Sequence, residues 1–78
     1  MTFSLTITTL SDVLFHGDAK SVTLPGSAGE LTVLAKHMPL VTPLRQGTIT
    51  VRTEGGEENF SVEKGILEVS REKVTVLL

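Results

Sequence analysis

The 78-residue chain lacks cysteine, tryptophan and tyrosine and has only three phenylalanines. Without cysteine it forms neither disulfides nor thiolate metal sites. Few aromatic residues and a net charge of −2 argue against nucleic-acid binding, for which small β-domains use stacking platforms and a basic face. No apolar run approaches the roughly 20 residues that span a bilayer, and no signal peptide is recognisable. We therefore expect a cytosolic or cytosol-facing protein without direct membrane insertion.

The residues that are abundant favour β-structure. Valine, isoleucine and threonine together number 23, and β-branched side chains fit a pleated sheet better than a helix. Apolar residues also alternate with polar ones along six short segments, which is typical of strands with one buried face. The alternating apolar residues are Phe3, Leu5 and Ile7; Val22 and Leu24; Leu31 and Val33; Ile49 and Val51; Phe60 and Val62; Val74 and Val76. The pattern predicts an all-β sandwich or flattened barrel.

Turn-forming residues divide these segments. We expect turns at residues 15–18, 25–29, 54–57 and 71–73, with Gly55-Gly56 as a two-residue hairpin. Residues 36–46 contain Pro39 and Pro43 and do not alternate strictly. We expect them to form a loop or a single helical turn.

Residues suited to catalysis or metal binding are scarce. The two histidines, His16 and His37, lack the neighbours of a nucleophile or an acid–base pair. His16, Asp18 and His37 do not have the spacing of a known metal site. The glycine-rich residues 26–30 lack the lysine of a phosphate-binding loop, so a hairpin turn is the better interpretation. We predict no catalytic residue, no metal and no cofactor.

One family accounts for most of the remaining motifs. The chain resembles the ε subunit of bacterial F-type ATP synthases over nearly its whole length. The resemblance rests on Phe15-x-Gly17, on Val22-Thr23-Leu24-Pro25-Gly26-Ser27-x-Gly29-Glu30-Leu31-x-Val33-Leu34, on His37-x-Pro39-Leu40-Val41-Thr42-x-Leu44-x-x-Gly47, on Gly55-Gly56-Glu57-Glu58-x-Phe60, on Gly65-Ile66-Leu67-Glu68-Val69 and on Val74-Thr75-Val76-Leu77.

The resemblance implies a single domain, residues 1–78, folded as a flattened ten-stranded antiparallel β-sandwich. It implies a non-catalytic subunit of the central stalk, peripheral to the cytoplasmic face of the bacterial inner membrane, that couples ion flow to ATP synthesis. By position, Ser27, Ala28, Gly29 and Glu30 would contact the polar loops of the membrane c-ring. By the same reasoning His37, Met38, Val41 and Thr48 would contact the γ subunit, while Leu40 and Leu44 are left open between core and interface.

The chain departs from the family pattern at several points. Ala35-Lys36 replaces the usual Pro-Gly, and Ala28 replaces a common acidic residue. Family members continue past the last strand into a two-helix C-terminal domain, whereas this sequence ends at Leu78, either as a naturally short form or as a truncated one. In both cases we expect the coupling role without inhibition or ATP binding. A free-standing β-sandwich that binds an unrelated protein partner is the alternative hypothesis.

Overall fold

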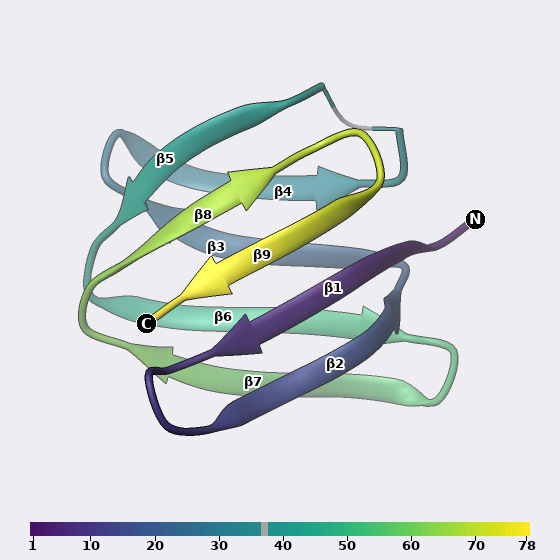
Figure 1. Cartoon of the computed structure of the whole chain (residues 1–78), viewed down its shortest axis with the longest axis horizontal. Helices are drawn as coiled ribbons and strands as arrows, with labels where there is room; N and C mark the ends of the chain where they lie inside the picture. The colour runs from purple at the N-terminus through teal and green to yellow at the C-terminus, as the bar shows by residue number, and fades with distance from the viewer. Residues whose placement is uncertain (37) are drawn as a thin grey trace.

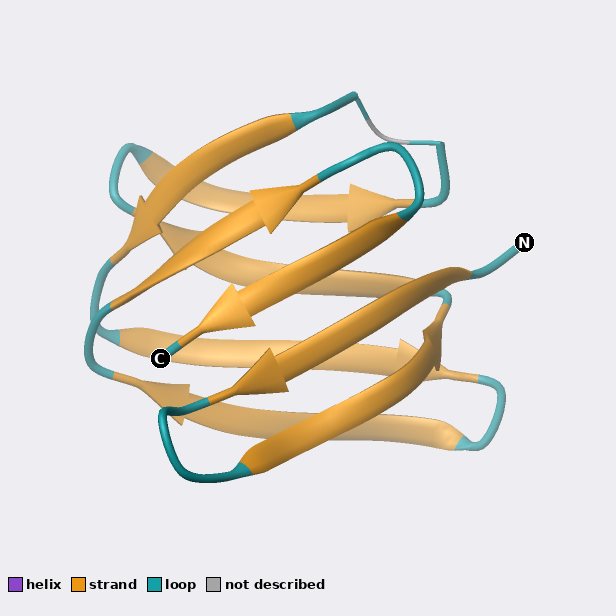
Figure 2. Cartoon of the chain, viewed as in Figure 1, coloured by secondary structure: helices purple, strands orange, loops and turns teal. Residues whose placement is uncertain are grey.

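The computed structural model describes residues 1–36 and 38–78, and within them the chain forms nine β-strands joined by turns and short loops (Figure 2). The strands are β1 (Phe3–Thr8), β2 (Val13–Ala19), β3 (Ser21–Gly26), β4 (Gly29–Leu34), β5 (Leu40–Leu44), β6 (Gly47–Thr53), β7 (Gly56–Val62), β8 (Gly65–Val69) and β9 (Lys73–Leu77). Among the described residues, no helix is long and apolar enough to cross a bilayer.

The strands belong to one curled sheet that folds into two layers (Figure 1). The front sheet has the order β2-β1-β9-β8-β5, and the rear sheet has the order β4-β3-β6-β7. The layers are joined at one corner, where Gly26 of β3 pairs with Leu44 of β5. Two backbone hydrogen bonds hold this corner, from Ser27 N to Pro43 O and from Arg45 N to Pro25 O, both 2.9 Å long.

The core lies between the two layers and is built by the alternation seen in the sequence. All but one of its large, fully buried side chains belong to the predicted apolar positions, and Leu67 of β8 is the addition. These side chains are Leu5, Ile7, Leu24, Ile49, Leu67, Val22, Val33, Val51 and Val76. Leu44 is also buried, and Leu40 packs partly buried against the same cluster. Both residues therefore contribute to the core.

The expected strand count and direction need correction. Nine strands, not ten, are present in the described residues, and β1 pairs with β9 in parallel although every other pair is antiparallel. Alternation identifies which side of a strand is buried, but it carries no information on which strand lies beside it or in which direction. The first and last strands, β1 and β9, are neighbours within the front sheet. Because they run parallel, the sheet contains both parallel and antiparallel pairs.

The turn expected at residues 15–18 is instead the middle of β2, where Gly17 pairs with Leu5. Long-range packing overrides the local His-Gly-Asp signal here. The ring of Phe15 meets the ring of Phe60 edge-on at 6.3 Å between centroids, which links β2 to β7 across the two layers. The chain turns earlier, where Thr9 N donates to Asp12 O at 2.8 Å.

The loop or helical turn expected over residues 36–46 is also wrong in part, because Leu40–Leu44 forms β5 and pairs with β8. Pro43 is accommodated because β5 is the last strand of the front sheet, and only its end continues into the rear layer. Both predicted glycine hairpins are present, but the two-residue turn of the second is Glu54-Gly55 rather than Gly55-Gly56, because Gly56 already pairs with Thr53. Gly29 and Gly56 open the second strands of their hairpins with φ of 139° and 136°, values that favour glycine.

Candidate protein-interaction surfaces

The hairpin between β3 and β4 projects from one end of the sandwich (Figure 1). Ser27 and Ala28 form its exposed turn, and Glu30 is exposed one residue after Gly29. Gly26 makes the tip compact, because an added Cβ would lie 2.6 Å from Leu31 Cδ2 and 2.8 Å from Gly29 O. The structure thus keeps together the four residues that were predicted to contact the c-ring, Ser27, Ala28, Gly29 and Glu30. The carboxylate of Glu30 lies beside the narrow turn.

The second predicted set does not form a single patch. Met38 is 78% exposed and lies in the connection between β4 and β5, at the opposite end of the sandwich from the β3–β4 tip (Figure 1). Val41 is 68% exposed on β5 and alternates with core-facing Leu40, so it points outward from the front sheet. Thr48 precedes buried Ile49 and points outward from the rear sheet. His37 lies outside the described residues.

The backbone near Met38 carries one departure from the family pattern. Lys36 has φ of 67°, in the left-handed region where glycine is the least strained residue. The family resemblance places a glycine at this position. The lysine therefore keeps the turn conformation at a cost of about 1–2 kcal/mol in backbone strain.

The register of the front sheet places residues of five strands in rows across its outer face. The first row, here called the apolar row, joins Pro43, Ile66, Leu77, Thr8 and Val13 as successive cross-strand partners. The second, the mixed row, joins Val41, Glu68, Thr75, Thr6 and His16. The third is polar and joins Lys73, Ser4 and Asp18. Along the strand direction, the outer face of the front sheet therefore changes from an apolar row, through the mixed row, to a polar row.

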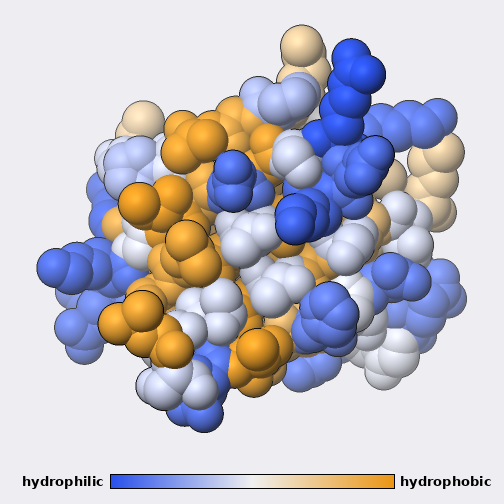
Figure 3. Space-filling view, viewed as in Figure 1, coloured by the Kyte–Doolittle hydropathy of each residue, from blue (hydrophilic) through white to orange (hydrophobic). Residues whose placement is uncertain are grey.

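Large apolar side chains are exposed on this face. Ile66, Leu77 and Val13 keep 47%, 51% and 63% of their surface in water. Five strands at about 4.8 Å spacing make the apolar row roughly 19 Å long. Figure 3 looks onto this front side and shows orange atoms gathered left of and near the centre, with blue atoms toward the right and along the left edge. A contiguous exposed apolar surface of this kind marks a contact site for another molecule.

Sequence reasoning missed Ile66, Leu77 and Val13 as surface candidates. Leu77 lies in the segment whose alternating residues Val74 and Val76 were assigned to the core. Ile66 and Val13 lie outside the six alternating segments and were given no role. The available signal was the alternation itself, because Ile66 and Leu77 fall out of phase with the buried residues Leu67 and Val76. An apolar residue on the polar side of an alternating strand indicates an exposed contact position.

The outer face of the rear sheet has a different character, because its polar side chains bond to one another. Thr23 Oγ1 and Thr32 Oγ1 lie 3.0 Å apart, and Thr50 Oγ1 donates to Asn59 Oδ1 at 2.9 Å. Arg52 Nε lies 3.5 Å from Glu57 Oε1. These six side chains of the rear face therefore already have partners within the domain.

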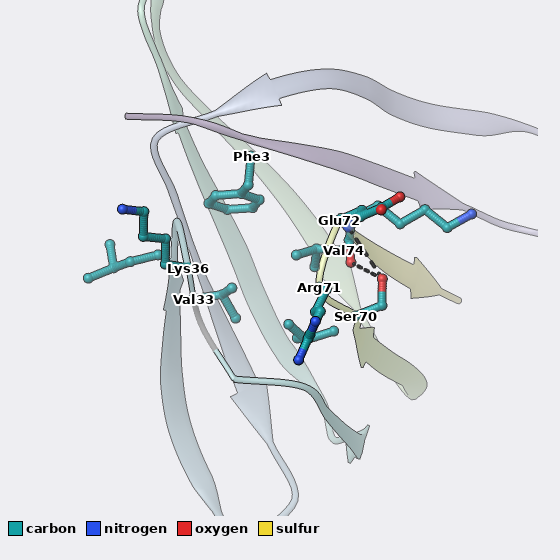
Figure 4. Close-up of a pocket in the computed structure, with 10 residues that line it drawn as sticks. Phe3, Val33, Lys36, Ser70, Arg71, Glu72 and Val74 are labelled. Atoms are coloured by element: carbon teal, nitrogen blue, oxygen red, sulfur yellow. Dashed lines mark hydrogen bonds between the residues drawn. The ribbon is translucent and has the colours of Figure 1, made fainter.

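A small hollow lies under the β8–β9 turn, near the end that carries Met38 (Figure 4). Phe3, Val33 and Val74 form its apolar floor, while Lys36, Arg71 and Glu72 lie at its rim. Ser70 caps the turn, because its Oγ donates to Lys73 O at 3.0 Å and accepts from Lys73 N at 3.3 Å. Among the described residues, this lining places no nucleophile beside a histidine base.

Comparison with known proteins points to one family. A family model described as the β-sandwich domain of the ATP synthase delta/epsilon chain matches residues 2–78. An ATP synthase epsilon chain from Bordetella petrii is 49% identical over 77 residues, and one from Bordetella parapertussis is 47% identical. Each alignment covers 97% of this chain and 55% of the relative, so the chain spans about half the length of the curated relatives it matches.

Solved structures with the same fold come from assembled ATP synthases. A chain in the Euglena gracilis mitochondrial ATP synthase, determined as OSCP/F1/c-ring, aligns with a TM-score of 0.89 and 25% identity, covering 97% of this chain and 49% of that one. A chain in the central stalk/c-ring structure of the Tetrahymena thermophila mitochondrial enzyme aligns with a TM-score of 0.79 at 15% identity, covering 100% of this chain and 65% of that one. The second likeness is one of fold alone.

Proposed function

Because the chain belongs to the family of ATP synthase delta/epsilon chain β-sandwich domains, we propose that it acts in the central stalk of a rotary F-type ATP synthase. In this role it links the γ subunit to the c-ring and couples ion flow to ATP synthesis, without catalysing a reaction itself. Its place is the cytoplasmic face of a bacterial inner membrane, as a peripheral part of the complex. The bacterial relatives named ATP synthase epsilon chain support this proposal.

One observation carries the proposal for γ: the apolar row on the front sheet. Its members Ile66 and Leu77 are paired neighbours that expose about half of their side chains, and the adjacent mixed row contains Val41. A stable subunit contact needs an apolar centre from which water is excluded. The front face offers such a centre, and Val41 extends it toward the β4–β5 connection that carries Met38.

The β3–β4 tip fits the c-ring for a different reason. Ser27 and Met38 lie near opposite ends of β4, and a six-residue strand spans roughly 17–20 Å. The tip and the β4–β5 connection can therefore reach two partners at once. Thr48 lies nearer to the tip on the rear side, since Gly47 packs so closely on Pro25 that an added Cβ would lie 2.9 Å from the ring. We accordingly assign the γ contact to the front face with Met38 and Val41, and leave Thr48 outside it.

A charge placed in the apolar row tests the γ assignment. Leu77→Asp puts a carboxylate where an apolar contact is expected, and binding must then desolvate it without a partner. We expect the dissociation constant for the γ subunit, measured by calorimetry, to rise about 100-fold, equivalent to about 2.7 kcal/mol. Circular dichroism establishes that the variant is folded.

Asn59→Asp is the matched control, because it adds the same charge to the rear face and keeps the acceptor for Thr50. Its affinity for γ should stay within about twofold of the unmodified chain. Failure of the unmodified chain to bind γ at micromolar concentration would refute the proposed function. Equal losses in both variants would refute the assignment of γ to the front face.

A further inference from the structure

The mixed row places a single carboxylate, that of Glu68, at the centre of the front face. Val41 and Thr75 are its cross-strand partners, and Ile66 is the next outward-facing residue along β8. Its immediate surroundings are therefore aliphatic and hydroxyl groups rather than charges. A carboxylate in such a position is unusual, because charged residues are depleted from the centres of protein interfaces.

Glu68 forms no ion pair within the described part of the chain. In that part, the oppositely charged side chains that approach within 4.0 Å are Arg52 and Glu57, on the rear face. The nearest cation of the same face is Lys73, on β9. Lys73 is diagonal to Glu68, because Glu68 pairs with Thr75. Diagonal neighbours lie about 7–8 Å apart, within reach of long side chains, yet the two charged groups do not come within 4.0 Å of each other. The carboxylate therefore keeps its hydration only as long as the front face is exposed to water.

Docking of a partner on the apolar row would remove that hydration. A carboxylate buried without a counter-charge opposes association strongly, whereas a charge-assisted hydrogen bond to lysine or arginine offsets the loss. From this placement we infer that the surface of γ that covers the front face presents a lysine or arginine side chain to Glu68, surrounded by apolar groups that meet Ile66 and Val41. Glu68 is then the residue that fixes the orientation of the contact, and the inference rests on the proposed function above.

The test replaces the charge and keeps the shape. Glu68→Gln should weaken binding to γ at least tenfold at low ionic strength, and the affinity of the variant should fall less steeply with added sodium chloride than that of the unmodified chain. Glu63→Gln is the control, because Glu63 is exposed in the turn between β7 and β8, outside the rows of the front face. Its affinity and salt dependence should match those of the unmodified chain.

The outcomes separate the two proposals. If the unmodified chain binds γ and Glu68→Gln binds equally well, the cation is absent and the inference is wrong. Tighter binding by Glu68→Gln also overturns it, and would instead make Glu68 a charge that guards the apolar row against unwanted association. If the unmodified chain does not bind γ at all, the proposed function itself fails.

Discussion

The outer faces of the two sheets differ in their chemistry. On the rear face the hydroxyl pair of Thr23 and Thr32 and the bond from Thr50 to Asn59 satisfy polar groups within the domain. On the front face Ile66 and Leu77 expose apolar surface, and Glu68 has no ion-pair partner within 4.0 Å among the described residues. Several polar side chains of the rear face are thus paired within the isolated domain, although Leu34 is exposed there as well, whereas the front face gains from a partner.

The difference matters because neither face is needed to build the core. The buried cluster lies between the layers and takes its side chains from the inward positions of both sheets. Exposed residues of either face contribute little to the free energy of unfolding, so folding alone gives no reason for one face to be apolar. The contrast between the faces therefore bears on recognition rather than on stability.

The largest expected effect on stability tests how closely the front sheet is held together. Gly65 of β8 approaches β9 so closely that an added Cβ would lie 2.5 Å from Leu77 O and 2.9 Å from Leu78 Cδ2. Gly65→Ala must separate the two strands, and we expect it to lower the free energy of unfolding by about 1–3 kcal/mol in urea titrations. It should also weaken γ binding, because Ile66 and Leu77 would move apart.

Gly55→Ala provides the comparison, because the nearest atom to its added Cβ is Thr53 Oγ1 at 3.9 Å. Its stability should lie within about 0.5 kcal/mol of that of the unmodified chain. A Gly65→Ala variant as stable as the Gly55→Ala variant would mean that the β8–β9 spacing adjusts freely. The precise alignment of the apolar row would then be unimportant.

Much of the fold follows from the sequence because burial is a local pattern. The inward positions of β1, β3, β4, β6, β7 and β9 were predicted from alternation, and the hairpins from their glycines. Strands β2, β5 and β8 were not, because they become strands through pairing with β1, with β8, and with β5 and β9, respectively. The pairing of β5 with β8 joins segments far apart in sequence, whereas β2 pairs with its neighbour in the chain, β1. In neither case does local propensity encode the pairing.

The candidate site shows the same limit. The β3–β4 tip is local, so its four residues could be chosen from the sequence and do lie together. The front face combines β2, β1, β9, β8 and β5, and a row across five strands is visible only when the register is known. For the same reason Val41 and Thr48 looked alike in the sequence, although they point outward from opposite sheets.

A smaller effect is expected at the β3–β4 tip, where function and stability should separate. Glu30 is exposed and its cross-strand partner is Pro25. Glu30→Lys reverses the carboxylate that is assigned to the c-ring, and we expect ion-driven ATP synthesis in membranes to fall roughly two- to tenfold. The free energy of unfolding of the isolated domain should change by less than about 0.5 kcal/mol.

Glu72→Lys makes the same change in charge in the β8–β9 turn, at the other end of the sandwich, and should leave ATP synthesis unaltered. If both variants impair synthesis equally, net charge rather than a contact at the tip is responsible. If neither does, Glu30 has no part in the c-ring contact.

The smallest effect is expected on the rear face, at its ion pair. Arg52 and Glu57 are cross-strand partners whose side chains remain 54% and 50% exposed, and water and salt screen pairs of this kind. Arg52→Gln should therefore change the free energy of unfolding by less than about 0.5 kcal/mol in urea titrations and leave γ affinity unchanged. A clear loss of γ affinity in Arg52→Gln with normal stability would show that the rear face also takes part in docking. The assignment of γ binding to the front face alone would then be wrong, because the rear face, whose ion pair lies within the domain, would also contribute to binding.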